Sequence, residues 1–174
     1  LALKILIPRQ RQAMETVPDE GLTQADLQTI LRYGQQKAQV FYEASHSIAN
    51  EQISHRLYSI GNTIEKIFKH FQTDPDDINA SHDFIYHDLE KAIEIVQMYQ
   101  NLVAVPQLNE EERQNLDQAE QTIELIQQAF QNQYKMLLEN DFREFSVAQA
   151  SLQQILLMKQ PALLNQLKSK DTHT

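Results

Sequence analysis

Apolar side chains recur every three or four residues along most of the chain, which is the spacing of one face of an α-helix. Thr23 followed by Asp26 is a capping-box pattern, and the apolar positions after it predict a first helix over about 23–49. The apolar stripe of this helix consists of Leu27, Ile30, Leu31, Ala38, Phe41 and Ile48. The spacing then slips by one residue, so we expect a break near Asn50 and a second helix over about 52–72.

The second helix has a regular alternation of four-residue and three-residue steps. Its stripe consists of Ile53, Leu57, Ile60, Ile64, Ile67 and Phe71. Thr73 and Asp74 precede Pro75, whose ring disfavours a helical conformation at Asp74, so the helix is expected to stop there. A third helix is expected to open at 74–77, where acidic side chains suit the positive end of a helix dipole. The stripe of that helix consists of Ile78, His82, Ile85, Leu89, Ile93, Val96, Tyr99 and Val103.

Pro106 separates the third helix from a fourth one. Asn109 is placed to cap this fourth helix, and three consecutive glutamates fill its first turn. Its stripe consists of Leu116, Ala119, Ile123, Ile126, Phe130 and Leu137.

Ser146 and Gln149 repeat the capping-box pattern close to the C-terminus. They predict a break near Asp141 and a last short helix over about 147–158. Taken together, the stripes and caps predict an all-α protein, an elongated antiparallel bundle of four to five helices without a sheet.

Composition favours one acidic domain. The chain has 174 residues with 3 Gly, 5 Pro and no Cys, which leaves little room for hairpins and excludes disulfides, thiolate metal sites and cysteine nucleophiles. The net charge of −9 argues against a dedicated nucleic-acid binder. We expect an N-terminal apolar and basic segment over 1–22, the helical domain over 23–160 and a polar tail over 161–174.

The N-terminal segment begins with an apolar stretch, LALKILI, followed at once by Arg9 and Arg11. Two interpretations are open on the residues alone. The stretch is either a first turn that docks on the domain or the tail of an upstream transmembrane helix, whose exit the positive-inside rule would mark with arginine. No run of 18 or more apolar residues occurs in the sequence itself.

Two His-Asp dipeptides, His82-Asp83 and His87-Asp88, are the candidate chemistry of the third helix. They resemble the His-Asp pair with which helical phosphohydrolases of the HD type hold divalent metals, ions that polarise phosphate oxygens and lower the pKa of bound water. The two histidines are five residues apart and therefore about 140° apart around an α-helix, which predicts that both pairs cannot line one site.

A metal site of that type needs further ligands. His55 or His70 is the candidate upstream ligand, and Asp141 is the candidate downstream one. The small residues that usually follow the pair are replaced here by Phe84 and by Leu89-Glu90. A capped or solvated histidine is the favoured interpretation of both dipeptides, so no metal, catalytic residue or cofactor is assigned. Serine-hydrolase, zinc-protease and phosphate-loop motifs do not occur.

The order of these segments resembles the XpaC-like family, which is named for 5-bromo-4-chloroindolyl phosphate hydrolysis. IEKIFKHFQTDP, which ends at Pro75, resembles the family's amphipathic helix before a proline. Phe84, Leu89 and Tyr99, with Ile93 and Val96 between the last two, fall at positions of its F-x-x-Y-Y-L-P motif and the tyrosine beyond it.

The resemblance extends to the C-terminal part, where ENDFREFSVAQASLQQIL is similar to the family's closing segment, and it covers about 23–158. His87 and Asp88 stand where two tyrosines are usual, and Glu90 replaces the motif proline, so no role of those residues is transferred. The toxic-anion-resistance (TelA-like) family has a similar helical style and is the nearest alternative.

Members of the XpaC-like family often carry a hydrophobic segment before a cytosolic helical domain, which favours the transmembrane interpretation of the N-terminal stretch. Our first hypothesis is a non-catalytic, membrane-associated domain at the cytoplasmic face of a bacterial plasma membrane, acting through protein contacts. Self-association through the helical stripes is a further expectation, and nucleic acid is not an expected partner. The alternative is a metal-dependent phosphohydrolase that uses the His-Asp pairs.

Overall fold

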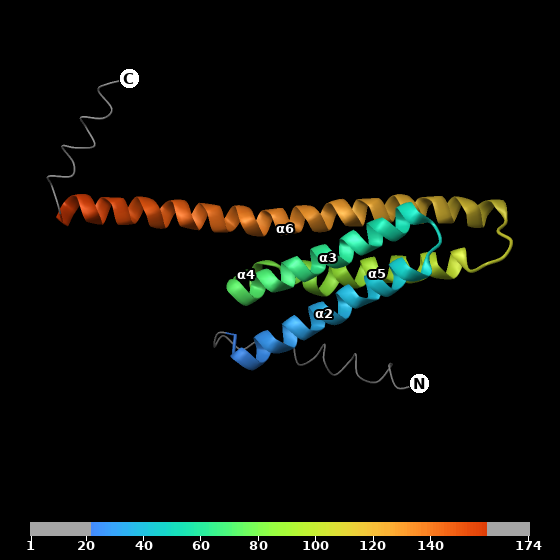
Figure 1. The fold of residues 1–174 in the computed structure, drawn as a ribbon, viewed down its shortest axis with the longest axis horizontal. Helices are drawn as coiled ribbons and strands as arrows, with labels where there is room; N and C mark the ends of the chain where they lie inside the picture. The colour runs from blue at the N-terminus through green and yellow to red at the C-terminus, as the bar shows by residue number, and fades with distance from the viewer. Residues whose placement is uncertain (1–21, 160–174) are drawn as a thin grey trace, which may run out of the picture. The chain divides into compact units, whose positions relative to one another are not determined.

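A computed structural model describes residues 22–159 of the protein. Five α-helices, α2 to α6, and one π-helix, η1, make up this part of the chain, which contains no strand (Figure 1). The all-α bundle predicted from the apolar stripes is therefore confirmed. The expected N-terminal segment and C-terminal tail lie outside the described residues, apart from Leu22.

The chain divides into two compact units, with the boundary between Tyr134 and Lys135. The first unit holds α2 to α5, η1 and the first half of α6, and the second holds the rest of α6. No described helix has both the length and the apolar character that crossing a bilayer requires.

Helices α2 (Gln24–Ser47) and α3 (Glu51–Thr73) form a helical hairpin whose ends follow the sequence signals. Thr23 and Asp26 make the reciprocal bonds of a capping box at the start of α2. The Asn50 side chain accepts hydrogen bonds from the backbone N–H groups of Gln52 and Ile53, so the predicted break near this residue is confirmed. All six apolar stripe positions of α3 are buried.

Glycine allows α2 and α3 to pack closely. A Cβ atom on Gly34 would lie 2.1 Å from the Phe68 ring of α3, and one on Gly61 would lie 2.6 Å from the Tyr42 ring of α2. Gly34 is buried and Gly61 is buried as well, so each provides the space that an aromatic ring from the facing helix fills. The hairpin therefore depends on hydrogen atoms, rather than methyl groups, at these two positions.

The region after Pro75 differs from the single third helix that the sequence predicts. A short helix, α4 (Asp77–Ala80), ends at Ser81, and the π-helix η1 (Phe84–Asp88) then leads into α5 (Leu89–Val103). The Leu89 N–H donates to the carbonyl of Phe84, five residues back. Phe84, Ile85 and Leu89 are all buried around this wider turn.

Helix α6 (Glu110–Lys159) is continuous, so the predicted break near Asp141 and the separate last helix are wrong. Asn109 caps its start, as expected, and the Glu112 side chain completes a capping box by accepting the Asn109 N–H. The Ser146 hydroxyl, however, donates to the Phe142 carbonyl one turn earlier instead of capping a new helix. Neither Gly nor Pro occurs between the two ends of α6, so nothing in this stretch forces a break.

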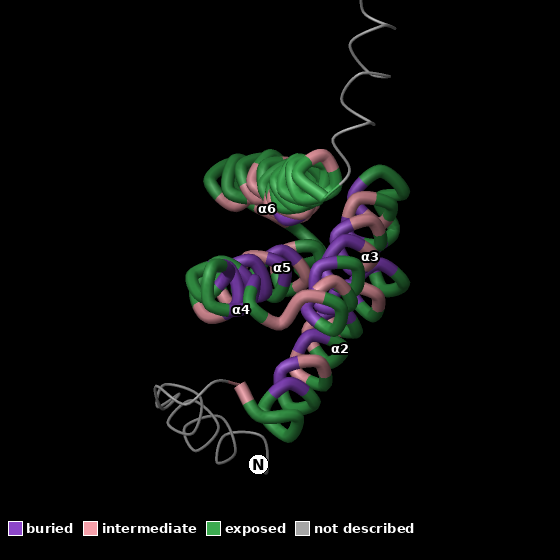
Figure 2. Tube along the Cα trace, turned by 90° about the vertical axis from the view of Figure 1, so that its left-hand side faces the viewer, coloured by how far each residue is buried: buried purple, intermediate pink, exposed green. Residues whose placement is uncertain are grey.

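Within the first unit, α6 is joined to α3 and α5 by long side chains. Arg56 of α3 forms an ion pair with Glu124 at 3.1 Å and donates to Gln127. The Tyr99 hydroxyl of α5 donates to Glu120 at 2.8 Å. Ile123, Phe130 and the α5 positions Leu89, Ala92, Ile93 and Val96 are buried, whereas much of the α6 surface is exposed (Figure 2).

Candidate functional site

The π-helix brings together two histidines that the sequence predicts to be apart. The rings of His82 and His87 lie 6.4 Å apart between centroids, and the His82 ring lies 4.6 Å from that of Tyr86. The predicted separation of about 140° is wrong here because residues five apart are neighbours on the surface of a π-turn. The His82 side chain is 56% exposed, so it also leaves the buried stripe on which the periodicity placed it.

The His-Asp dipeptides themselves are open to solvent. The Nδ1 atom of His82 lies 3.5 Å from Oδ1 of Asp83, whose side chain is 91% exposed, and His87 and Asp88 are exposed as well. Within residues 22–159, none of these four side chains belongs to a group of three His, Asp or Glu side chains with ligand atoms within 4.8 Å of one another. The two dipeptides thus place two neighbouring imidazoles on a solvent-exposed surface.

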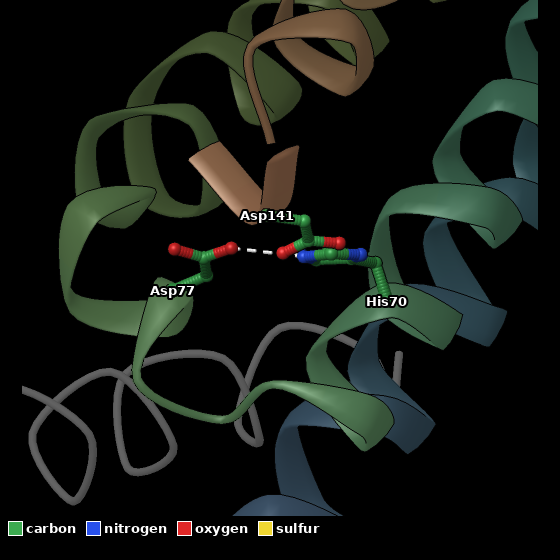
Figure 3. Close-up of side chains that lie close together, drawn as sticks. All are labelled: His70, Asp77 and Asp141. Atoms are coloured by element: carbon green, nitrogen blue, oxygen red, sulfur yellow. Dashed lines mark hydrogen bonds and ion pairs between the residues drawn. The ribbon is translucent and has the colours of Figure 1, made fainter. Parts of the chain in front are cut away.

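His70 and Asp77 form a buried polar pair at the junction of α3 and α4. The distance from Nε2 of His70 to Oδ2 of Asp77 is 2.8 Å, and the two side chains are 8% and 7% exposed (Figure 3). The His70 carbonyl also accepts the N–H of Asp74, which closes the end of α3. The pair therefore fixes the turn that contains Pro75, because both of its members are withdrawn from water and bonded to one another.

The other two residues of the predicted metal set are His55 and Asp141. His55 is exposed on α3, fifteen residues before His70, beside a surface depression of about 490 Å³ that it lines together with Ser45, His46 and Tyr58. Asp141 is a partly exposed residue of α6 in the second unit.

A polar cluster on α2 and α5 supports the π-helix. The Tyr33 hydroxyl donates to the carbonyl of Ile85 at 3.3 Å and also to the Glu90 carboxylate. Nζ of Lys37 lies 2.6 Å from the same carboxylate and 5.0 Å from the centre of the Tyr33 ring. Sequence reasoning missed this cluster. Its only signal was Glu90 at the position of the motif proline, and pairing with Lys37 explains how a charge is accommodated there.

A shallow apolar depression of about 320 Å³ lies between α5 and the first half of α6. Phe84 and Phe130 meet edge to face at its end, with ring centroids 4.9 Å apart. Asp88 and Lys91 provide opposite charges along its lining. Most of the other lining side chains are aliphatic, including Ile95, Leu125 and Ile126.

The second unit carries the most exposed apolar surface among the described residues. We define the C-terminal apolar face of α6 as Phe142, Phe145, Leu152, Ile155 and Leu156, whose exposed fractions range from 71% for Phe142 to 46% for Leu156. Val147 and Met158 are also exposed, on the opposite side of the helix. A helix of the interior or of a bundle buries such a face, and a large exposed apolar patch usually marks an interaction site.

The positions that resemble the family motif are packing positions in this fold. Phe84, Leu89 and Tyr99 are each less than 5% exposed, and Pro75 follows the end of α3. Burial raises the pKa of the Tyr99 hydroxyl above its usual range, and its hydrogen bond to Glu120 adds to this effect. These residues therefore organise the core of the first unit.

The fold and these surfaces define an all-α helical protein with a buried histidine–aspartate pair, a solvated histidine pair on a π-helix and an exposed apolar helix face. A family model described as "5-bromo-4-chloroindolyl phosphate hydrolysis protein" matches residues 1–148, so the chain belongs to that family, the XpaC-like family that its motifs resemble. Comparisons with curated proteins and with solved structures give no significant match.

Proposed function

We propose that this protein is a non-catalytic helical domain of the XpaC-like family that acts through protein contacts. The observation that carries the proposal is the C-terminal apolar face of α6. Between Phe142 and Lys159, large apolar side chains are exposed on a regular helix, and exposure of this kind costs free energy in water unless a partner covers the face.

Protein is a better match than lipid for this face. Helices that lie in a membrane surface carry Lys and Arg on their polar side, which anionic headgroups attract. Residues 145–158 contain no charged side chain at all, and the whole chain has a net charge of −9. Membrane association therefore has to come from elsewhere in the protein.

We assign that role to the N-terminal stretch LALKILI and the arginines that follow it. The protein is then held at the cytoplasmic face of a bacterial plasma membrane. Fractionation of cells that express the full-length gene product tests this location. Recovery in the membrane fraction, resistant to high salt, is expected, and recovery wholly in the soluble fraction contradicts it.

The non-catalytic part of the proposal is tested with purified protein. 5-Bromo-4-chloroindolyl phosphate is incubated with the chain and added Mg²⁺, Mn²⁺ or Zn²⁺, and bound metal is measured by elemental analysis. We expect neither stoichiometric metal nor turnover above a buffer control. Turnover that co-purifies with the protein and needs its own side chains contradicts the proposal.

A metal-dependent phosphohydrolase is the second candidate. The 6.4 Å separation of the His82 and His87 rings favours it, because two imidazoles so close together are able to share one metal ion after small rotations. In this case His82→Ala and His87→Ala each abolish metal binding and turnover. His55→Ala is the matched control, since that exposed histidine lies away from η1 and its loss leaves both readouts unchanged.

A further inference from the structure

We infer that the partner covering the C-terminal apolar face of α6 is a second copy of this chain. This inference rests on the proposed function, because it names the partner of the face through which the protein is proposed to act. The two helices would form a two-stranded coiled coil between Leu138 and Lys159.

The apolar face has the spacing of a coiled-coil seam. Steps of four and three residues alternate from Leu138 to Leu156 through the positions 138, 142, 145, 149, 152 and 156. Phe142 and Phe145 are 71% and 67% exposed, and Leu152 is 56% exposed, so the seam is free to receive another helix. This seam is distinct from the register of Ile123 and Phe130, which are seven residues apart and buried within the first unit.

Gln149 favours a second copy of this chain, rather than an unrelated apolar helix, as the partner. It is the single polar residue of the seam and lies at its middle. A primary amide is both donor and acceptor, so two Gln149 side chains that meet across a dimer satisfy each other. An apolar partner would leave the amide without a hydrogen bond in a desolvated seam, which is costly.

The distribution of charge along the chain also favours a second copy as the partner. Two copies of a protein with a net charge of −9 repel one another over most of their surfaces. The stretch 145–158 has no charged side chain, so it is a surface on which two copies approach without like-charge contact. A strongly basic or acidic partner would find no complementary charge there.

The first experiment uses the absence of cysteine from the chain. Gln149→Cys places one thiol on the seam, and Gln154→Cys places one thiol on the opposite side of the same helix, replacing the same residue type. Under mild oxidation of the full chain we expect Gln149→Cys to form a disulfide-linked dimer rapidly, and Gln154→Cys to stay largely unlinked. Equal linking rates for the two variants would overturn the inference.

The second experiment measures mass by sedimentation equilibrium. The full chain is expected to sediment at twice its monomer mass of 20.2 kDa. Leu152→Glu puts a charge into the seam and is expected to halve that mass, whereas Val147→Glu, at an exposed position off the seam, is expected to leave it unchanged. Far-ultraviolet circular dichroism checks that both variants keep the helical content of the parent protein.

The outcomes separate this inference from the proposed function. A monomeric parent chain, or a dimer that Leu152→Glu does not dissociate, contradicts self-association and leaves contacts with another protein standing. Turnover with bound metal contradicts the non-catalytic function whatever the mass is. Flotation of the chain with phosphatidylcholine vesicles, lost in Leu152→Glu and kept in Val147→Glu, would overturn the inference in favour of a lipid-covered face.

Discussion

The α2–α3 hairpin and the C-terminal half of α6 are both amphipathic and helical, yet the apolar face is buried in the hairpin and exposed in α6. In α3, Leu57, Ile60 and Ile64 are completely buried. In α6, Phe142 and Phe145 are larger side chains and are more than two-thirds exposed. Hydrophobicity is therefore similar in the two regions, and what differs is how far the apolar face is exposed.

The polar groups follow the same division. Helix α3 is fixed at one end by the Asn50 cap and at the other by the buried His70–Asp77 pair. Beyond Tyr134, an ion pair within α6 joins Lys135 and Glu139 one turn apart, and both of its side chains are exposed. Exposed pairs of this kind contribute only about 0.3–0.5 kcal/mol. Polar contacts therefore stabilise the α2–α3 hairpin, whereas this exposed ion pair adds little to the stability of the C-terminal half of α6.

The largest expected contrast comes from removing one phenylalanine from each region. Phe71→Ala empties a completely buried site in α3 and is expected to lower the free energy of unfolding by about 3–5 kcal/mol. Phe142→Ala removes a side chain that is 71% exposed and is expected to change it by less than about 0.5 kcal/mol in dilute protein. Urea unfolding at low protein concentration measures both, and equal losses would contradict the comparison.

A methyl group at Gly34 tests the close packing of the hairpin. Alanine normally stabilises a helix by about 1 kcal/mol relative to glycine. Here its Cβ would lie 2.1 Å from the buried Phe68 ring, and overpacking of a core costs about 1–3 kcal/mol, so Gly34→Ala is expected to be destabilising by up to about 2 kcal/mol.

Gly61→Ala is the graded control for this substitution. Its Cβ would meet the ring of Tyr42, which is partly exposed and able to move outward, so a smaller loss is expected. Thermal unfolding followed by circular dichroism orders the two variants. Stabilisation by Gly34→Ala would show that the two helices leave room for a methyl group at this position.

The cap between the two helices makes a smaller contribution. Asn50→Ala removes the acceptor of two backbone N–H groups and is expected to cost about 1 kcal/mol. Asn50→Gly keeps water access to those groups and is expected to cost only a few tenths of that. Urea midpoints of the two variants that do not differ would contradict a capping role for the side chain.

The dependence of stability on alkaline pH is the smallest expected effect, and it tests two tyrosines of the first unit. Burial, followed by the charge of Glu65, raises the pKa of Tyr42 to about 12, and burial also raises that of Tyr99. Because the pKa of each of these tyrosines is higher in the folded than in the unfolded state, its contribution to stability is complete below pH 10. This contribution is lost as the pH rises toward 12. Unfolding free energy is therefore expected to fall over this interval, and less steeply in Tyr42→Phe.

Absorbance at 295 nm follows the tyrosinates directly in the same samples. Ionisation of all tyrosines in one step near pH 10, in the folded protein, would contradict the raised values.

Local signals in the sequence predicted most of the helices. The capping box at Thr23, the cap at Asn109 and the stop at Pro75 act within one turn of backbone, so their residues are neighbours in the chain and recognisable there. The apolar stripe of α3 was predicted completely, because a single helical phase runs through it. The Ser146 pattern failed because the same hydroxyl bonds equally well to the preceding turn of a continuing helix.

Only the tertiary structure decided the geometry around η1. Burial of Phe84 against Phe130 and the hydrogen bond from Tyr33 to the Ile85 carbonyl stabilise a π-turn that no local propensity signals. That turn moves His87 close to His82 and so changes the candidate site. The sequence by itself thus determined where helices begin and which faces are apolar, since both depend on residues a few positions apart. Which faces are buried, and which side chains meet, depended on helices that are distant in the chain and therefore on the fold.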